Sequence, residues 1–171
     1  MRISIGDEQW SLNEIGPAEW TMLNELPGMA DFNRSEKGRK RILPDPTGED
    51  ETDLVADWRE FVVPELESQF TDSIAKVAHA IGMAEEYEEE EIGILRRVDV
   101  SKEDAEVWYQ VLNQARLIMN EDHDLSRVEQ EFFSGETEPT ELSEEAMRLI
   151  MRNRFFAAIQ EMILTSMMEI D

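Results

Sequence analysis

The last helical segment of the chain, residues 143–168, constrains the fold more than any other feature. It begins at Ser143, whose hydroxyl can cap a helix, and the acids Glu144 and Glu145 suit the positive end of the helix dipole. Beyond that start, apolar residues surround most of the circumference and leave only a narrow polar strip. A helix that is apolar on most sides has to be covered on most sides, so we expect it at the centre of a bundle.

Two further segments have the spacing of amphipathic helices. From Glu51 onward, apolar residues recur at intervals of three and four, and after Pro64 the pattern continues to Ile81. We expect Pro64 to split this segment into two helices or to kink one. A third helix is expected after Ser101, where a capping residue precedes an apolar stripe made of Ala105, Trp108, Leu112, Ala115 and Met119.

Three short runs predict strands. Residues 2–5 and 9–12 flank Gly6 and Asp7, a pair typical of hairpin turns. Residues 92–100 are rich in β-branched side chains. The chain is therefore expected to be α+β and mostly helical, a bundle of four to six helices with a small N-terminal β-hairpin or three-stranded sheet.

We expect one domain over residues 1–171, because a chain of this length is close to the common size of a single domain. The N-terminal hairpin and a helix would occupy 1–33. A charged loop would follow at 34–50. The helical body, with its strand near 92–100, would occupy 51–171.

The net charge of −24, from 40 acidic and 16 basic residues, narrows the possible partners. Nucleic acid and anionic membrane surfaces need a positive footprint, so we expect neither as a partner, whereas a basic protein would be complementary. Without cysteine, disulfides and thiolate chemistry are excluded. The start lacks the apolar core of a signal peptide, and Gln160 with Glu161 interrupts the most apolar stretch, so we expect a cytoplasmic protein.

Residues 84–91 contain a dense run of glutamates between a predicted helix and a predicted strand. Clustered carboxylates can bind a hard cation such as calcium, but a cage needs side chains that converge. Neighbouring side chains on a helix or an extended segment diverge instead. We interpret the run as a solvated connection.

Residues 120–131 resemble a calcium-binding loop more closely. The ligand positions 1, 3, 5 and 12 of an EF-hand loop would be Asn120, Asp122, Asp124 and Glu131. Position 6 is Leu125, where the sharp turn of such a loop requires glycine. We therefore interpret the spacing as chance in an acidic chain and expect no metal site.

The sequence singles out no catalytic residue and no cofactor site. His79 and His123 lie far apart along the chain, and neither a phosphate-binding glycine loop nor a nucleophile elbow is present. The basic segment 34–41 could bind RNA or an acidic protein, but it has no aromatic residue among its bases. We expect it to be a flexible loop that nearby acids shield.

The aromatic residues and methionines of the last helix have two interpretations. Methionine fills irregular cores and also serves adaptable binding surfaces. Core packing is the more common reason. The alternative is an interface for self-association or for a partner, formed by Phe155, Phe156, Met162 and Met167.

Two segments resemble an actinobacterial family whose domain has no known function. The first is similar to an Arg-x-Leu-x-Pro-Asp-Pro motif of the family, whose counterparts here are Arg41, Leu43, Pro44, Asp45 and Pro46, with no residue between the leucine and the first proline. The second is a Trp-x-x-x-Leu-Asn-x-x-Arg-Leu helix headed by a carboxylate, matched by Asp104, Trp108, Leu112, Asn113, Arg116 and Leu117. The resemblance extends over residues 40–168 and implies no activity, cofactor or catalytic residue. It does imply genes that often neighbour the gene of the adaptor that delivers substrates to the Clp protease.

The motif residues have side chains that suit structural roles. Arg116 can lie beside its helix stripe and reach a carbonyl or a carboxylate, for which Asp45 is one candidate. Asn113 can satisfy a backbone group. We expect both to stabilise the fold.

Taken together, these features predict a non-enzymatic interaction or regulatory protein, which could be an accessory in protein turnover. Its surface for a partner would be the last helix or the acidic exterior. One alternative is a carboxylate-based metal-binding protein or hydrolase that uses acids such as those at 120–131. Another is an acidic mimic of nucleic acid that occupies a basic protein.

Overall fold

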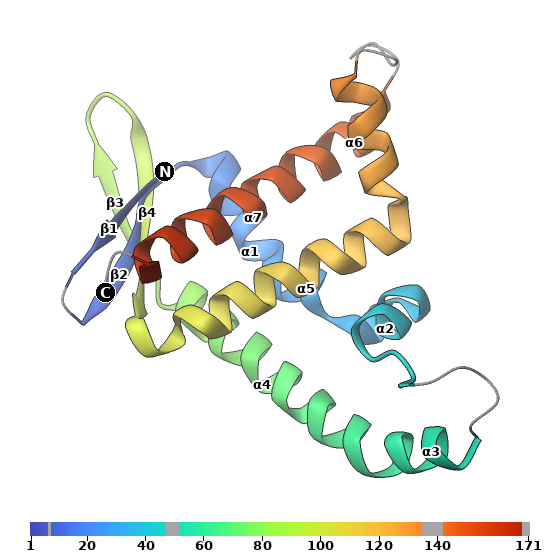
Figure 1. The fold of residues 1–171 in the computed structure, drawn as a ribbon. Helices are drawn as coiled ribbons and strands as arrows, with labels where there is room; N and C mark the ends of the chain where they lie inside the picture. Colours follow the sequence, from blue (N-terminus) through green and yellow to red (C-terminus); the bar gives the residue numbers. More distant parts are fainter. Residues whose placement is uncertain (7, 47–51, 135–141, 169–171) are drawn as a thin grey trace.

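A computed structural model describes residues 1–6, 8–46, 52–134 and 142–168 of the chain and shows a mostly helical α+β fold, as expected (Figure 1). Its four strands form one antiparallel sheet with the order β1-β2-β4-β3. The strands are β1 (Arg2–Ile5), β2 (Gln9–Ile15), β3 (Glu85–Glu89) and β4 (Gly93–Ser101). The predicted hairpin and the strand near 92–100 are both confirmed, as β1–β2 and β4.

The glutamate run was interpreted as a solvated connection. Its side chains are exposed, but five of its residues form a strand, β3, which corrects the interpretation as a connection. In the structure, β3 and β4 form a hairpin in which Glu86 lies opposite Arg96 and Glu85 opposite Arg97. Opposite charges on residues that face each other across two strands stabilise the pairing of the strands. Gly93 completes the hairpin turn with a φ of 91°, a backbone conformation that glycine adopts without strain.

Helices make up most of the rest of the chain. They are α1 (Pro17–Ala30), α2 (Glu36–Ile42), α3 (Thr52–Asp57), α4 (Val63–Gly82), α5 (Ala105–His123), α6 (Leu125–Phe133) and α7 (Glu144–Met168). Three short helical turns join them: η1 (Phe32–Arg34), the π-helix η2 (Trp58–Val62) and η3 (Lys102–Asp104). None of the helices that the structure describes is long and apolar enough to cross a membrane.

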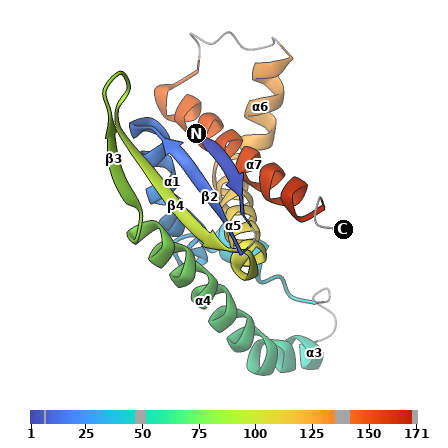
Figure 2. The ribbon, with the colours of Figure 1, turned by 90° about the vertical axis from the view of Figure 1, so that its left-hand side faces the viewer.

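The helices pack against one face of the sheet, with α5 at their centre (Figures 1 and 2). Helix α5 contacts α1, α2, α4 and α7. The expectation that the last helix is central is therefore wrong in detail, because α5 occupies that place. Helix α7 packs along one side of α5 and keeps an outer face that exposes Met151 and Leu164.

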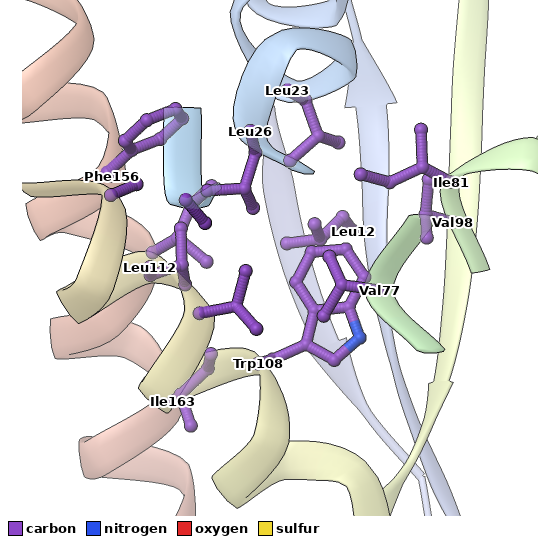
Figure 3. Packing of buried hydrophobic residues seen from close by; sticks show 14 of the residues in the cluster. Leu12, Leu23, Leu26, Val77, Ile81, Val98, Trp108, Leu112, Phe156 and Ile163 are labelled. Carbon is purple, nitrogen blue, oxygen red and sulfur yellow. The ribbon is translucent and has the colours of Figure 1, made fainter. Parts of the chain in front are cut away.

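One large hydrophobic core joins the sheet to the five helices α1, α4, α5, α6 and α7. Figure 3 shows Leu12 and Val98 of the sheet, Leu23 and Leu26 of α1, Val77 and Ile81 of α4, Trp108 and Leu112 of α5, and Phe156 and Ile163 of α7. These side chains point toward one another. The stripes predicted on α4 and α5 supply the part of this core that comes from those helices.

The segment 34–50, expected to be a loop, contains the helix α2. Ser35 caps it by accepting a hydrogen bond from the Gly38 N–H at 2.9 Å. Its acid, Glu36, lies in the first turn and three of its four bases lie in the last, as the helix dipole favours. Gly38 lets the helix approach α5 closely, since a Cβ at that position would lie 2.9 Å from Ile118 Cγ2.

Pro64 lies in the first turn of α4, where its missing N–H costs little. The residues before it form η2, so that α3, η2 and α4 make one continuous helical rod (Figure 1). The chain accommodates the proline with a π-helical turn and without a break. The consequence is that α3 extends well away from the sheet (Figure 2).

Candidate interaction surfaces

The most distinctive surface of the protein is the free edge of β3. The strand pairs with β4 on one side, and no strand in the described part of the chain pairs with its other side. All five of its residues are exposed, and four of them are glutamates. Two more glutamates, Glu90 and Glu91, follow in the turn. The edge therefore presents backbone hydrogen-bonding groups and negative charge at the same place.

The bases opposite this strand neutralise little of its charge. Arg96 binds Glu86 at 2.6 Å and lies over the ring of Trp20. Arg97 binds Asp99 at 2.7 Å. Within the described residues, the carboxylates of Glu88–Glu91 have no ion-pair partner, so that end of β3 carries uncompensated negative charge.

The outer face of the sheet next to β3 holds a small polar network. Asp99 accepts hydrogen bonds from Ser11 Oγ at 2.5 Å and from Arg97 Nε at 2.7 Å. Partial burial would raise the pKa of Asp99, but the hydrogen bonds from Ser11 and Arg97 outweigh it and hold that pKa below its ordinary value. Asp99 thus remains ionised and binds Arg97, which lies opposite Glu85 at the other end of β3 from Glu88 and Glu89.

The four candidate calcium ligands on 120–131 each have other partners. Asp124, with a φ of 49°, joins α5 directly to α6, so the segment forms no loop. Arg127 binds the carboxylates of Asp124 and Glu131, both at 2.6 Å. Asn120 Oδ1 accepts a hydrogen bond from the Ser126 N–H at 2.8 Å, and Asp122 accepts one from Ser35. Nowhere in the ranges that the structure describes do three His, Cys, Asp or Glu side chains gather as metal ligands.

One hollow brings together residue types used in hydrolysis. His123, Ser143 and Glu145 all line a hollow of about 220 Å³ between α5, α6 and α7. However, the hydroxyl of Ser143 caps α7 by accepting a hydrogen bond from the Ala146 N–H at 3.0 Å. No described hydrogen bond links the three side chains. The arrangement therefore assigns no nucleophile and no base.

The first family motif lines a hollow between α2 and the helical rod. Asp45 accepts two hydrogen bonds from Arg59, at 2.9 and 2.6 Å, and those bonds lower the pKa of Asp45. The hollow measures about 380 Å³ and is lined by Glu36, Arg39, Lys40, Leu43, Asp45, Arg59 and Val63. Arg41 lies across from Glu121 of α5 at 3.5 Å, and Pro44 is exposed. Each cation that lines the hollow has an ion-pair partner: Arg39 pairs with Glu67, Lys40 with Glu36 and Arg59 with Asp45.

The second motif contributes Trp108 and Leu112 to the hydrophobic core. Trp108 is buried in the core, whereas Asn113 is exposed and makes no hydrogen bond within the described residues, so its expected role is not seen. Arg116 binds Asn153 Oδ1 at 3.1 Å and the Oε1 of buried Gln160 at 2.6 Å. Arg116 thus reaches two side-chain carbonyl oxygens, whereas the candidate partner Asp45 is bound to Arg59.

Arg116→Ala is expected to lower the free energy of unfolding by about 1–3 kcal/mol, because Gln160 would lose a hydrogen bond inside the protein. Urea denaturation monitored by circular dichroism measures this change. Asn113→Ala, on the exposed side of the same helix, is the control and should change stability by less than about 0.5 kcal/mol. Equal effects of the two substitutions would show that the Arg116–Gln160 contact contributes nothing.

The four candidate interface residues of the last helix are not equivalent. Phe156 lies wholly inside the core. Phe155 and Met162 are half-buried and pack against that core. The side chain of Met167 lies outside the part of the chain that the structure describes. Self-association through α7 therefore stays a prediction, and Phe156 has a sufficient structural role without it.

Comparison with known proteins gives one match. A family model described as a domain of unknown function (DUF2017) matches residues 13–167. No curated protein and no solved structure matches the chain.

Proposed function

The chain belongs to the DUF2017 family, a domain of unknown function, and on that premise we propose that it is a non-enzymatic interaction protein for basic partners. The observation that carries this proposal is the exposed edge strand β3, with its glutamates. The ligand that this edge fits is an extended protein segment that carries lysines or arginines.

The chemistry of such binding is strand addition. An extended peptide can hydrogen-bond to the free backbone groups of an edge strand, while its side chains provide specificity. Alternate residues of the added strand would lie beside glutamates of β3 and of the following turn. The net charge of −24 would also accelerate the approach of a basic partner, because long-range attraction raises association rates at low salt.

The glutamates have a second consequence, which limits the choice of partner. Charged residues on an edge strand prevent two copies of the same sheet from pairing. Two β3 strands would bring like charges together, so a second copy of this chain is a poor ligand for the edge. A basic segment of another protein is not subject to this repulsion.

The test uses an extended peptide with alternating lysine and threonine, fluorescently labelled and titrated with the full chain. We expect binding that weakens steeply as salt rises, since exposed charges are screened. The double variant Glu88→Lys/Glu89→Lys should weaken the peptide at least tenfold. The control Asp72→Lys/Glu106→Lys makes the same change in net charge at exposed acids away from β3 and should weaken it less than about threefold.

Proline substitutions separate strand addition from attraction by charge alone. Backbone N–H groups alternate between the two sides of a strand, so one of Tyr87 and Glu88 directs its N–H to the free edge. Proline is tolerated at that position and removes the donor. If the folded proline variant binds the peptide as tightly as the unaltered chain, the peptide is not added as a strand. If both double lysine variants weaken binding equally, β3 is not the site.

One finer proposal follows from the family resemblance, and another follows from the glutamates of β3. We propose that the protein acts in the cytoplasm as an accessory in protein turnover, in keeping with the neighbouring adaptor gene that the resemblance implies. The row of glutamates on β3 favours a second candidate, an acidic mimic of nucleic acid. Competition distinguishes the two, because a mimic must be displaced from its basic partner by DNA or RNA, whereas a turnover accessory need not be.

A further inference from the structure

The rod formed by α3, η2 and α4 ends in an apolar arm that the rest of the molecule does not use. We define the arm as residues 52–62, that is, α3 and η2. Leu54 is 48% exposed and Phe61 is 66% exposed. Val55, Trp58 and Val62 are half-buried. None of them belongs to the large core or packs against it, and the same holds for a smaller buried cluster made of Phe32, Leu43 and Ile118.

The position of the arm explains why its apolar residues remain uncovered. α3 packs chiefly against η2, the next segment of the same rod. Figure 1 shows α3 at the end of the rod farthest from the sheet, and Figure 2 shows the same arrangement from the side. Leu54 and Phe61 are both exposed and lie on either side of the half-buried Trp58 in the sequence, so together they form an apolar strip that the described elements leave largely uncovered.

The charges around this strip are all of one sign apart from one base that is already paired. Asp53, Asp57 and Glu60 are exposed, and within the described residues their carboxylates have no ion-pair partner. Arg59, the arm's base, is held by Asp45 through two hydrogen bonds. The strip is thus bordered by uncompensated negative charge. A second copy of the arm would bring the same acids face to face, which disfavours self-association.

Trp58 adds an observation of a different kind. Its indole N–H is buried and has no acceptor in the part of the chain that is described. A buried donor without an acceptor costs free energy. A partner that repacks this turn could allow the N–H to find an acceptor.

We propose that the arm is a docking surface for an amphipathic helix of a partner protein, with apolar anchors on one face and lysines or arginines beside them. The apolar anchors would cover Leu54 and Phe61, and the bases would pair with Asp53, Asp57 and Glu60. This surface is separate from β3, and the inference does not depend on the function proposed there. It requires a helix because the arm presents a helix face and no strand edge.

The test uses two helical peptides of about 18 residues with the same leucine face, one with lysines and the other with glutamates on its flanks. Each is titrated into the full chain labelled with ¹⁵N, and the amide shifts locate the site. We expect the lysine peptide to shift residues 52–62 and the glutamate peptide to bind at least tenfold more weakly. The variant Leu54→Ser/Phe61→Ser should lose at least tenfold in affinity with an unchanged unfolding midpoint.

The matched control is Met83→Ser/Met151→Ser, which removes side chains that are 69% and 57% exposed but lie outside the arm. It should leave the affinity of the lysine peptide unchanged. The proposal is overturned if both peptides bind alike, if the shifts lie outside 52–62, or if Leu54→Ser/Phe61→Ser binds like the control. Sedimentation of the chain alone provides a further test, because a dimer that Leu54→Ser/Phe61→Ser dissociates would make a second copy the occupant instead.

Discussion

Trp108→Ala is expected to lower the free energy of unfolding by about 3–5 kcal/mol, the usual cost of removing a fully buried large aromatic side chain. Trp108 is 1% exposed and lies where α5 meets the sheet. Its ring packs edge-to-face against Trp10 of β2, with centroids 5.7 Å apart and planes at 79°. The alanine variant would leave a cavity between the sheet and the central helix. Since single domains are stable by only about 5–15 kcal/mol, a substantial part of the total stability would be lost.

Urea denaturation followed by circular dichroism measures this loss. Trp20→Ala is the control, because Trp20 is only half-buried at the edge of the same core, with Arg96 over its ring. The control should cost less than half as much as Trp108→Ala. Similar losses for the two variants would mean that Trp108 packs no better than a residue at the edge. The position of Trp108 in the second family motif would then need an explanation other than packing.

The parts of the fold that the sequence predicted are those with a clear local pattern. The stripe from Leu66 to Ile81 became the face of α4 that packs inward, with Val77 and Ile81 buried. The stripe from Ala105 to Met119 became the buried face of α5. Helical spacing persists in the sequence wherever one side of a helix packs against a core. The turn at Gly6 and the β-branched run of β4 were equally local signals.

The strand β3 could not be predicted in the same way, because its sequence EEYEE has a low intrinsic preference for strands. Its structure depends on a neighbour, since the pairing with β4 places Glu85 and Glu86 opposite Arg97 and Arg96. A signal was nevertheless present. An acidic run followed by a short turn with glycine and then a pair of arginines is what a hairpin with charged cross-strand pairs requires.

The helix α2 was missed for a different reason. Its many charges suggested a loop, but Ser35 and Glu36 at its start and the bases at its end are an ordinary helix pattern. What the sequence could not show is the packing of α2 on α5, where Gly38 lies against Ile118. Packing of this kind stabilises a helix that is too short to be stable alone.

The candidate interaction surfaces, too, could be predicted from the sequence only in part. The sequence located the negative charge and the apolar residues, but it could not show that the glutamates lie on a free strand edge or that Leu54 and Phe61 are uncovered. Both facts depend on which elements are neighbours in space. Likewise, the sequence could not show that Arg116 binds Gln160 of α7 and that the candidate partner Asp45 is bound to Arg59.

In the last helix, the sequence could not show which apolar residues face the core and which face an interface. Phe155 and Phe156 were both candidates for an interface. Consecutive residues on an α-helix point about 100° apart, so two adjacent phenylalanines cannot both face one core directly. In the structure, Phe156 is 0% exposed and belongs to the core, and Phe155 is half-buried and packs against the edge of it. The apolar pattern alone could not decide which of the two faces inward.

Phe156→Ala is therefore expected to lower the free energy of unfolding by about 3–5 kcal/mol, and Phe155→Ala by less than half of that, because the cost follows the buried area that is lost and the cavity that remains. Chemical denaturation of the two variants measures the difference directly. Light scattering of the same samples tests self-association, which an interface on α7 would require. A Phe155→Ala variant that alters the oligomeric state at little cost in stability would assign Phe155 to an interface. A larger loss of stability for Phe155→Ala than for Phe156→Ala would contradict the packing of α7 against α5, because the wrong side of the helix would then be the buried one.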